Sequence, residues 1–256
     1  MKIKNIQNVL NERHKKQITK MVIWFVQIGK MECKIQIQTA SGNNSEMVFK
    51  SGWRGFVAIN PSCLQIQSGS LRYKRINVMM MAKLQAFIDK SLVKKSAQHI
   101  SKSDEAFAVV EVPDSSILHS RREIEYWLLG ETLNPKSGTD QFLNLLRNTE
   151  WYWVVYFLLN EFNGNNRLKN LCQRYGLSLA HFRRICRIAL GNTTKVALRD
   201  WRMVKAILDL VLKNQNLTEV AFEHGYASLS HFSSEVKEAL GVSPKKLLQT
   251  ITNTTN

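Results

Sequence analysis

The spacing of apolar residues changes along the chain, from strand-like in the first third to helical in the rest. Between residues 21 and 78, short apolar or alternating runs are separated by glycine, asparagine, serine and proline, which is typical of strands joined by turns. The runs cover 21–28, 34–38, 57–59, 64–67 and 71–78. They predict a small antiparallel sheet or half-barrel. The polar, basic residues 1–20 are expected to be a disordered arm.

The pattern turns helical after residue 78. We expect a helix over 79–93, a polar loop at 94–104, a strand at 106–112 and a helix that begins at 114 or 115 and runs through 129. Residues 134–138, Asn-Pro-Lys-Ser-Gly, combine turn-forming residues and form the expected linker. Residues 1–138 are therefore predicted to form an N-terminal α+β domain of sheet and helices. Residues 139–256 are predicted to form an all-α domain.

One pattern occurs twice in the C-terminal part. Residues 168–191 contain Leu-x-x-Leu-Cys-x-x-x-Gly, Ser-x-x-His-Phe and Leu-Gly, and residues 217–241 contain Leu-x-x-Val-Ala-x-x-x-Gly, Ser-x-x-His-Phe and Leu-Gly. A repeat of this length is a duplicated supersecondary unit. A short helix, a glycine turn, a serine in N-cap position and a second helix make a helix-turn-helix. We expect the two units at about 167–191 and 216–241.

A long linker helix is expected between the two units, over 194–212. Its buried stripe is predicted to consist of Ala197, Trp201, Val204, Leu208 and Val211. A continuous helix would fix the distance between the units, as two successive major-groove segments of DNA, roughly 34 Å apart, require.

Helical phase gives the second helix of the first unit two different faces. The inward face holds Phe182, Ile185, Cys186 and Ala189, and the outward face holds Ala180, Arg183, Arg184 and Arg187. Three like charges on one face repel each other, which a polyanionic partner would offset. Arginine can grip phosphate or the edge of guanine, and a small alanine permits close approach to a groove. A solvated basic face remains the alternative.

The matching helix of the second unit has the same design with different side chains. Phe232, Val236 and Ala239 are predicted to face inward, and Ser230, Ser233, Ser234 and Lys237 outward. Serine contacts phosphates and several base edges but specifies weakly. The first unit is therefore expected to supply most of the affinity and selectivity. His181 and His231 flank the two outward faces, where either phosphate contact or simple exposure fits.

The formal net charge of +16 over 256 residues favours a polyanionic partner, either nucleic acid or an anionic membrane surface. The charge is spread over both parts of the chain. Residues 150–256 hold 14 Lys and Arg against 8 Asp and Glu, and residues 1–149 hold 22 against 12. The basicity of the first part fits auxiliary DNA contact, attraction to an acidic partner, or no specific role.

The four cysteines form no Cys-x-x-Cys pair, and no histidine stands at metal-ligand spacing from them. We expect reduced thiols in a cytoplasmic protein without a metal or cofactor. No apolar run reaches the roughly 18 residues of a membrane span. Since no reactive cysteine or carboxylate constellation is evident either, the chain is predicted not to be an enzyme.

The second repeat resembles the DNA-binding domain of the AraC/XylS family of bacterial transcription regulators. The resemblance rests on residues 225–232, Gly-Tyr-Ala-Ser-x-Ser-His-Phe, and on 241–244, Gly-Val-Ser-Pro. The linker helix agrees at Arg202 and Ala206, whereas Cys172 stands where the family usually has alanine. Residues 180–186, 125–127 and 151–153 are similar to the InvF/MxiE branch, so that the resemblance covers roughly residues 80–250.

The resemblance implies a transcription activator that binds double-stranded promoter DNA, recruits RNA polymerase and lies on the nucleoid. It assigns DNA-facing positions to Ala180, Arg183, Arg184, Ser230, His231 and Ser234, and we count Arg202 among the candidates. The InvF/MxiE branch activates type III secretion genes with a secretion chaperone as co-activator. The N-terminal domain would then dock that partner or form a homodimer. Three alternatives to this function remain. They are a regulator with an effector-binding barrel in its N-terminal domain, a DNA-modifying enzyme, and a basic adaptor for acidic proteins.

Overall fold

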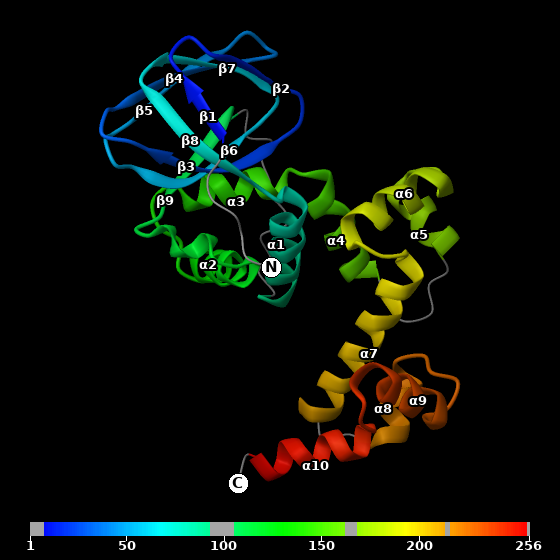
Figure 1. The fold of residues 1–256 in the computed structure, drawn as a ribbon. Coiled ribbons are helices and arrows are strands. Elements are labelled where there is room, and N and C mark those ends of the chain that lie inside the picture. The colour runs from blue at the N-terminus through cyan, green and yellow to red at the C-terminus, as the bar shows by residue number, and fades with distance from the viewer. Residues whose placement is uncertain (1–7, 93–104, 162–167, 213–215, 255–256) are drawn as a thin grey trace. The chain divides into compact units, whose positions relative to one another are not determined.

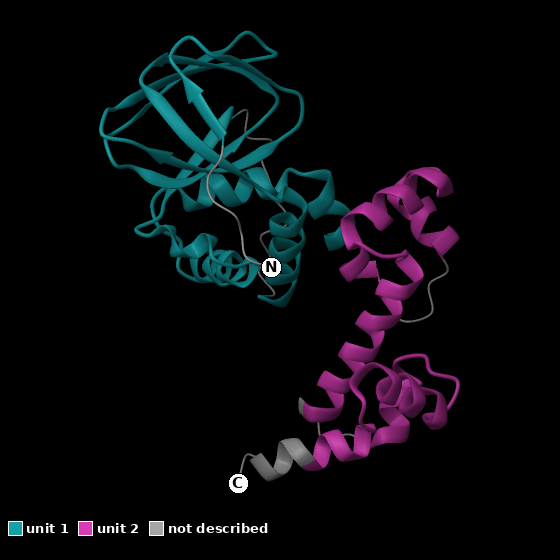
Figure 2. Ribbon diagram, viewed as in Figure 1, with its two compact units in different colours: residues 1–156 teal, residues 157–256 magenta. Residues whose placement is uncertain are grey.

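The computed structural model describes residues 8–92, 105–161, 168–212 and 216–254. The chain divides into two compact units, residues 1–156 and residues 157–256 (Figure 2). Each unit has its own buried core. Among the described helices, none is long and apolar enough to cross a membrane.

Unit 1 contains two antiparallel sheets (Figure 1). The five-stranded sheet has the order β1 (Asn8–Asn11), β8 (Ser70–Ile76), β3 (Val22–Ile28), β6 (Arg54–Ile59) and β9 (Phe107–Glu111). The four-stranded sheet has the order β2 (Lys15–Ile18), β7 (Ser62–Ser68), β4 (Cys33–Thr39) and β5 (Asn44–Phe49). Trp24 and Tyr73 stack between the sheets with ring centroids 4.2 Å apart. The predicted antiparallel sheet is confirmed, whereas β5 was not predicted.

The prediction of a disordered arm over 1–20 is wrong for its described part. β1 pairs with β8, and β2 pairs with β7. Leu10 and Ile18 are buried in the core between the sheets. Each short strand is held because it places one apolar side chain in that core and hydrogen-bonds to a longer strand. The polar composition of residues 1–20 gives no sign of this strand pairing.

Three helices lie on the face of the five-stranded sheet that points away from the other sheet: α1 (Val78–Ser91), α2 (Arg121–Leu133) and α3 (Thr139–Arg147). The ring of Phe56 on β6 lies 4.3 Å from Trp127 of α2 and 6.3 Å from Phe142 of α3. The helix predicted from residue 114 is instead split. A short 3-10 helix, Ser115–Leu118, precedes α2, which begins after the N-cap Ser120. The loop predicted at 94–104 lies outside the described residues.

The carboxylate of Asp89 joins three helices of unit 1. It accepts hydrogen bonds from Arg147 Nε at 2.8 Å and Nη2 at 2.9 Å, and from the hydroxyl of Tyr152 at 2.9 Å. Tyr152 lies on α4 (Glu150–Glu161), so α1, α3 and α4 meet at one anion. Burial and the Asp89 charge raise the pKa of the Tyr152 hydroxyl, which therefore stays a hydrogen-bond donor.

The sequence placed the domain boundary at the linker 134–138, whereas unit 1 extends to Tyr156. The 134–138 segment is a tight turn packed on the sheet. Gly138 has a φ of 80°, and a Cβ there would stand 2.6 Å from the carbonyl oxygen of Val109. Lys136 Nζ lies 3.1 Å from the buried carboxylate of Glu131. These contacts hold α3 on unit 1.

Unit 2 contains the two helix-turn-helix units that the repeat predicts. The helices are α5 (Leu168–Tyr175), α6 (Leu179–Leu190), the linker helix α7 (Thr194–Leu212), α8 (Leu217–Glu223), α9 (Leu229–Leu240) and α10 (Pro244–Thr254). Ser178 and Ser228 cap α6 and α9, because their Oγ atoms accept from the amides of His181 at 3.3 Å and His231 at 3.1 Å. Helix α10 was not predicted.

Candidate nucleic-acid interface

Helix α6 has the two faces that its sequence predicts. Its inward side chains, Phe182, Ile185, Cys186 and Ala189, are buried. The outward residues Ala180, Arg183, Arg184 and Arg187 are exposed, and His181 is half-buried. We refer to α6 as the first recognition helix. Its arginines face solvent as a group, which is what contact with a polyanion requires.

Aromatic packing holds the first recognition helix in place. The ring of Phe182 lies 5.4 Å from Tyr175 of α5 and 6.3 Å from Phe157 of α4. Cys186 is fully buried on the same face, and this burial raises the pKa of its thiol to about 11. Because the inward face is buried and packed against aromatic rings, the arginines project from a helix that is anchored on its opposite side.

Helix α9, the second recognition helix, departs from its prediction at one position and buries a residue for which no prediction was made. Phe232 and Val236 are buried as expected, but Ala239 is exposed, so its predicted inward position is wrong. Glu235 is buried and was not predicted to be. Ser230, His231, Ser234 and Lys237 are exposed, and Ser233 is half-buried. The last turn of α9 thus rises away from the core that Phe232 anchors.

Glu235 connects the second recognition helix to α7. Its Oε2 lies 3.3 Å from Arg202 Nη2, and its Oε1 accepts a 2.8 Å hydrogen bond from the hydroxyl of Tyr226. The guanidinium of Arg202 stacks over the Tyr226 ring at 4.2 Å. Burial and the Glu235 acceptor raise the pKa of the Tyr226 hydroxyl, which remains protonated. Arg202, a DNA-binding candidate from the sequence, is therefore engaged inside the protein.

The predicted buried stripe of α7 is wrong at Val204 and Leu208, and Trp201 and Val211 are only half-buried. Met203, Ala206 and Leu210 pack into the core of the second helix-turn-helix unit, whereas Val204 and Leu208 are 49% and 50% exposed. Only Ala197 of the predicted stripe is buried. The helix carries two apolar stripes. Helical periodicity alone does not indicate which of them packs against the second helix-turn-helix unit.

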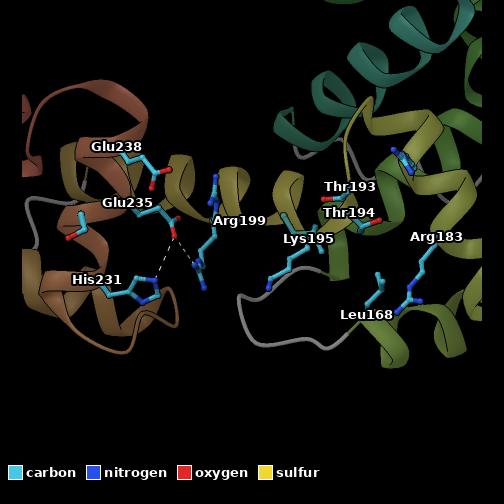
Figure 3. Close-up of a pocket in the computed structure, with 13 residues that line it drawn as sticks. Leu168, Arg183, Thr193, Thr194, Lys195, Arg199, His231, Glu235 and Glu238 are labelled. Atoms are coloured by element: carbon cyan, nitrogen blue, oxygen red, sulfur yellow. Dashed lines mark hydrogen bonds and ion pairs between the residues drawn. The ribbon is translucent and has the colours of Figure 1, made fainter.

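A groove of about 1060 Å³ runs along α7 between the two recognition helices. Figure 3 shows Lys195 and Arg199 extending from α7 between Arg183 on one side and His231 on the other. The lining residues include five of the predicted candidates: Arg183, Arg187, Arg202, His231 and Ser234. Ala180, His181, Arg184, Ser230, Ser233 and Lys237 are not among its lining residues.

The sequence prediction missed two basic residues of this groove, Lys195 and Arg199. They lie four residues apart on α7, on one helix face. Their i, i+4 spacing is the sequence signal for a basic face of α7. Two carboxylates, Glu235 and Glu238, line the groove on the side of α9. The groove is thus basic toward α6 and acidic toward α9.

Comparison with known proteins agrees with this geometry. A helix-turn-helix domain family matches residues 171–250. The invasion protein InvF of Salmonella typhi is 39% identical over 180 residues, which cover 70% of this chain and 82% of InvF. The chain belongs to the AraC/XylS family of transcription regulators. The transcriptional regulator MxiE of Shigella flexneri is 33% identical over 198 residues, covering 75% of this chain and 92% of MxiE.

Two solved structures are also similar to this AraC/XylS-family chain. ToxT from Vibrio cholerae has a TM-score of 0.36 and 12% identity over 94% of this chain and 96% of ToxT. The C-terminal domain of AraT from Geobacillus stearothermophilus has a TM-score of 0.34 and 26% identity over 38% of this chain and 80% of that domain.

Family membership makes this chain a DNA-binding transcription regulator and not an enzyme.

Cys172 stands where the family usually has alanine, and the local structure accommodates it. Its side chain is buried, and its Sγ donates to the carbonyl oxygen of Lys169 at 3.0 Å. The thiol thus fills the position of a small residue without leaving its polar atom unpaired.

Proposed function

We propose that this protein is a sequence-specific activator of type III secretion or other virulence genes. The observation that carries the proposal is the similarity to InvF and MxiE over most of both relatives, joined to an exposed arginine face on α6. The protein would act in the cytoplasm on the nucleoid, where it binds promoter DNA and recruits RNA polymerase.

The two recognition helices would enter successive major-groove segments. The first would supply most of the affinity and base selectivity through Arg183, Arg184 and Arg187, with Ala180 permitting close approach. The second would mainly anchor the complex through Ser230, Ser233, Ser234 and Lys237, because serine hydroxyls discriminate weakly between bases. His181 and His231 would lie beside phosphates. Arg202 would act indirectly, by orienting α9 through Glu235.

Unit 1 would dock a secretion chaperone that serves as co-activator. Tyr126, Leu129 and Leu133 stand at i, i+3 and i+7 on α2 and are 67%, 39% and 49% exposed. We call these three residues the α2 stripe. An exposed apolar helix face of this kind supports a protein-binding role. The excess of basic residues in 1–149 favours a partner that combines an apolar groove with acidic surroundings. A second copy of the chain could occupy the same face.

Footprinting on promoter DNA, with and without a co-purified partner, tests this proposal. The tagged full chain is expressed in an enteric host that carries a type III secretion system, and bound proteins are identified by mass spectrometry. We expect a small secretion chaperone, and a footprint over two adjacent major-groove segments that strengthens with the chaperone. Protection that responds to a metabolite instead would favour an effector-binding regulator. No protection on any secretion promoter would contradict the assigned gene class.

A further inference from the structure

Three basic side chains form a ridge on α7. Lys195, Arg199 and Arg202 stand at i, i+4 and i+7, which places them on one face of the helix. All three line the groove between the recognition helices. Together with Arg183 and Arg187 of α6, they give the groove five basic side chains against the two carboxylates of α9. The ridge thus continues the basic surface of the first recognition helix toward the second.

The three residues of the ridge differ in their engagement. The Arg202 side chain is 17% exposed and is held by Glu235 and Tyr226. The Arg199 side chain is 46% exposed, and its ion pair with the half-exposed Asp200 has a distance of 3.5 Å. Such a surface pair contributes little and exchanges readily. Lys195 is exposed. Lys195 and Arg199 can therefore turn toward a ligand at small cost.

The beginning of α7 adds to the positive potential of the groove. Thr193, Thr194 and Lys195 line the groove at the N-terminal end of a 19-residue helix. The macrodipole of such an end favours an anion, and Thr193 Oγ1 accepts from only one of its amides, that of Val196 at 3.4 Å. Arg187 reaches the same groove from α6. The basic residues of α7, those of α6 and the beginning of α7 thus all contribute positive potential to one part of the groove.

We propose that Lys195 and Arg199 form a phosphate-binding subsite for the sugar-phosphate backbone of duplex DNA between the two major-groove segments. The proposal rests on the proposed DNA-binding mode of the recognition helices. With a rise of about 1.5 Å per residue, the 19 residues of α7 span about 28 Å. Successive major-groove segments lie roughly 34 Å apart, so the backbone between them passes along α7.

The subsite binds phosphate and does not read bases. Phosphate contacts position a protein on DNA and carry no sequence information directly. Glu238 on the opposite wall repels phosphate, which directs the backbone toward α6 and the start of α7. The subsite therefore adds affinity for any duplex and fixes which side of the groove the strand follows.

Salt titration of DNA binding tests the subsite. The full chain and its Lys195→Gln, Arg199→Gln and double variants are titrated with a footprinted promoter duplex and with an unrelated duplex of equal length. Each substitution should weaken binding to both duplexes on the order of five-fold at about 0.15 M salt. The slope of log K against log salt should become shallower by about 0.9 for each residue. Lys205→Gln, an exposed position of α7 outside the groove, is the matched control.

The outcomes separate this subsite from the proposed function. Unchanged slopes in the double variant, with steep salt dependence in the wild type, would overturn the subsite and leave the DNA-binding role intact. A loss on the promoter duplex alone would also overturn it, because that result indicates base contact. If Lys205→Gln lost as much DNA affinity as the groove variants, the loss would reflect net charge alone, and the subsite would be overturned. A wild-type protein that binds neither duplex would overturn the proposed function itself.

Discussion

Arg202 on α7 and Glu235 on α9 form the ion pair that links the linker helix to the second recognition helix, with Nη2 3.3 Å from Oε2. Both side chains are largely buried, at 17% and 9% exposure. Because the pair also includes the Tyr226 hydroxyl and ring, it fixes the direction in which α9 projects. The orientation of the second recognition helix is thus set by a polar contact in addition to its apolar core.

Glu235→Ala should lower the free energy of unfolding of unit 2 by about 3 kcal/mol, since a buried guanidinium loses its partner. DNA affinity should fall with it. Glu238→Ala, one turn further along α9 and exposed, should change stability by less than about 0.5 kcal/mol. Urea denaturation followed by tryptophan fluorescence measures both. If Glu235→Ala lowered the free energy of unfolding no more than Glu238→Ala does, the contacts of Glu235 would contribute nothing to stability.

The two recognition helices should contribute unequally to DNA binding. Arg183→Ala should weaken promoter binding by about 10- to 100-fold, the range expected for a lost bidentate contact. Ser234→Ala should change it by only a few-fold, because one hydroxyl contact is weaker. Fluorescence anisotropy with a promoter duplex compares the two variants. Losses of equal size would contradict the assignment of selectivity to α6.

The sequence was sufficient where a pattern has only one physical solution. The inward face of α6, the capping serines and the glycine turns follow directly from periodicity and backbone chemistry, and the structure confirms them. The φ of 80° at Gly176 and 73° at Gly225 is the left-handed conformation that each turn needs.

The sequence was insufficient where the outcome depends on partners distant in the chain. Helical periodicity fits the two apolar stripes of α7 equally well. Only the packing of Met203 and Ala206 in the core of the second helix-turn-helix unit shows which stripe is buried. Glu235 stands between an outward serine and an inward valine, and nothing local signals its contact with Arg202, 33 residues away. Leu10 and Ile18 stabilise strands through a core built from later residues. Long-range contacts decided each case.

The buried thiols should resist alkylation. Burial raises the pKa of the Cys33 and Cys186 thiols from 9.0 to about 11, so both stay protonated at pH 8 in the folded protein. Their contribution to stability is present in full below about pH 9 and is lost as the pH rises toward 11. Mass spectrometry after brief iodoacetamide treatment should find label on the half-buried Cys63 before Cys33 or Cys186. Early labelling of Cys186 would indicate that α6 is not packed as described.

The α2 stripe should control the response to the co-activator without affecting DNA binding. Leu129→Ser combined with Leu133→Ser should weaken chaperone capture by at least about ten-fold, since two apolar contacts are lost. Val48→Ser, at a 53% exposed position of β5, is the matched control. Pulldown with the purified chaperone measures the difference. Normal capture by the double variant would place the docking surface elsewhere.

The salt dependence of DNA binding by the full chain is the most direct measurement of the central claim that α6 and α9 bind duplex DNA together. Dissociation constants for a duplex that spans two major-groove segments are measured from low to high salt. We predict a linear fall of log K with log salt that becomes shallower by about 0.9 for each phosphate-contacting basic residue removed. A slope near zero in the wild type, or one unaffected by joint substitution of Arg183, Arg184 and Arg187, would contradict the account.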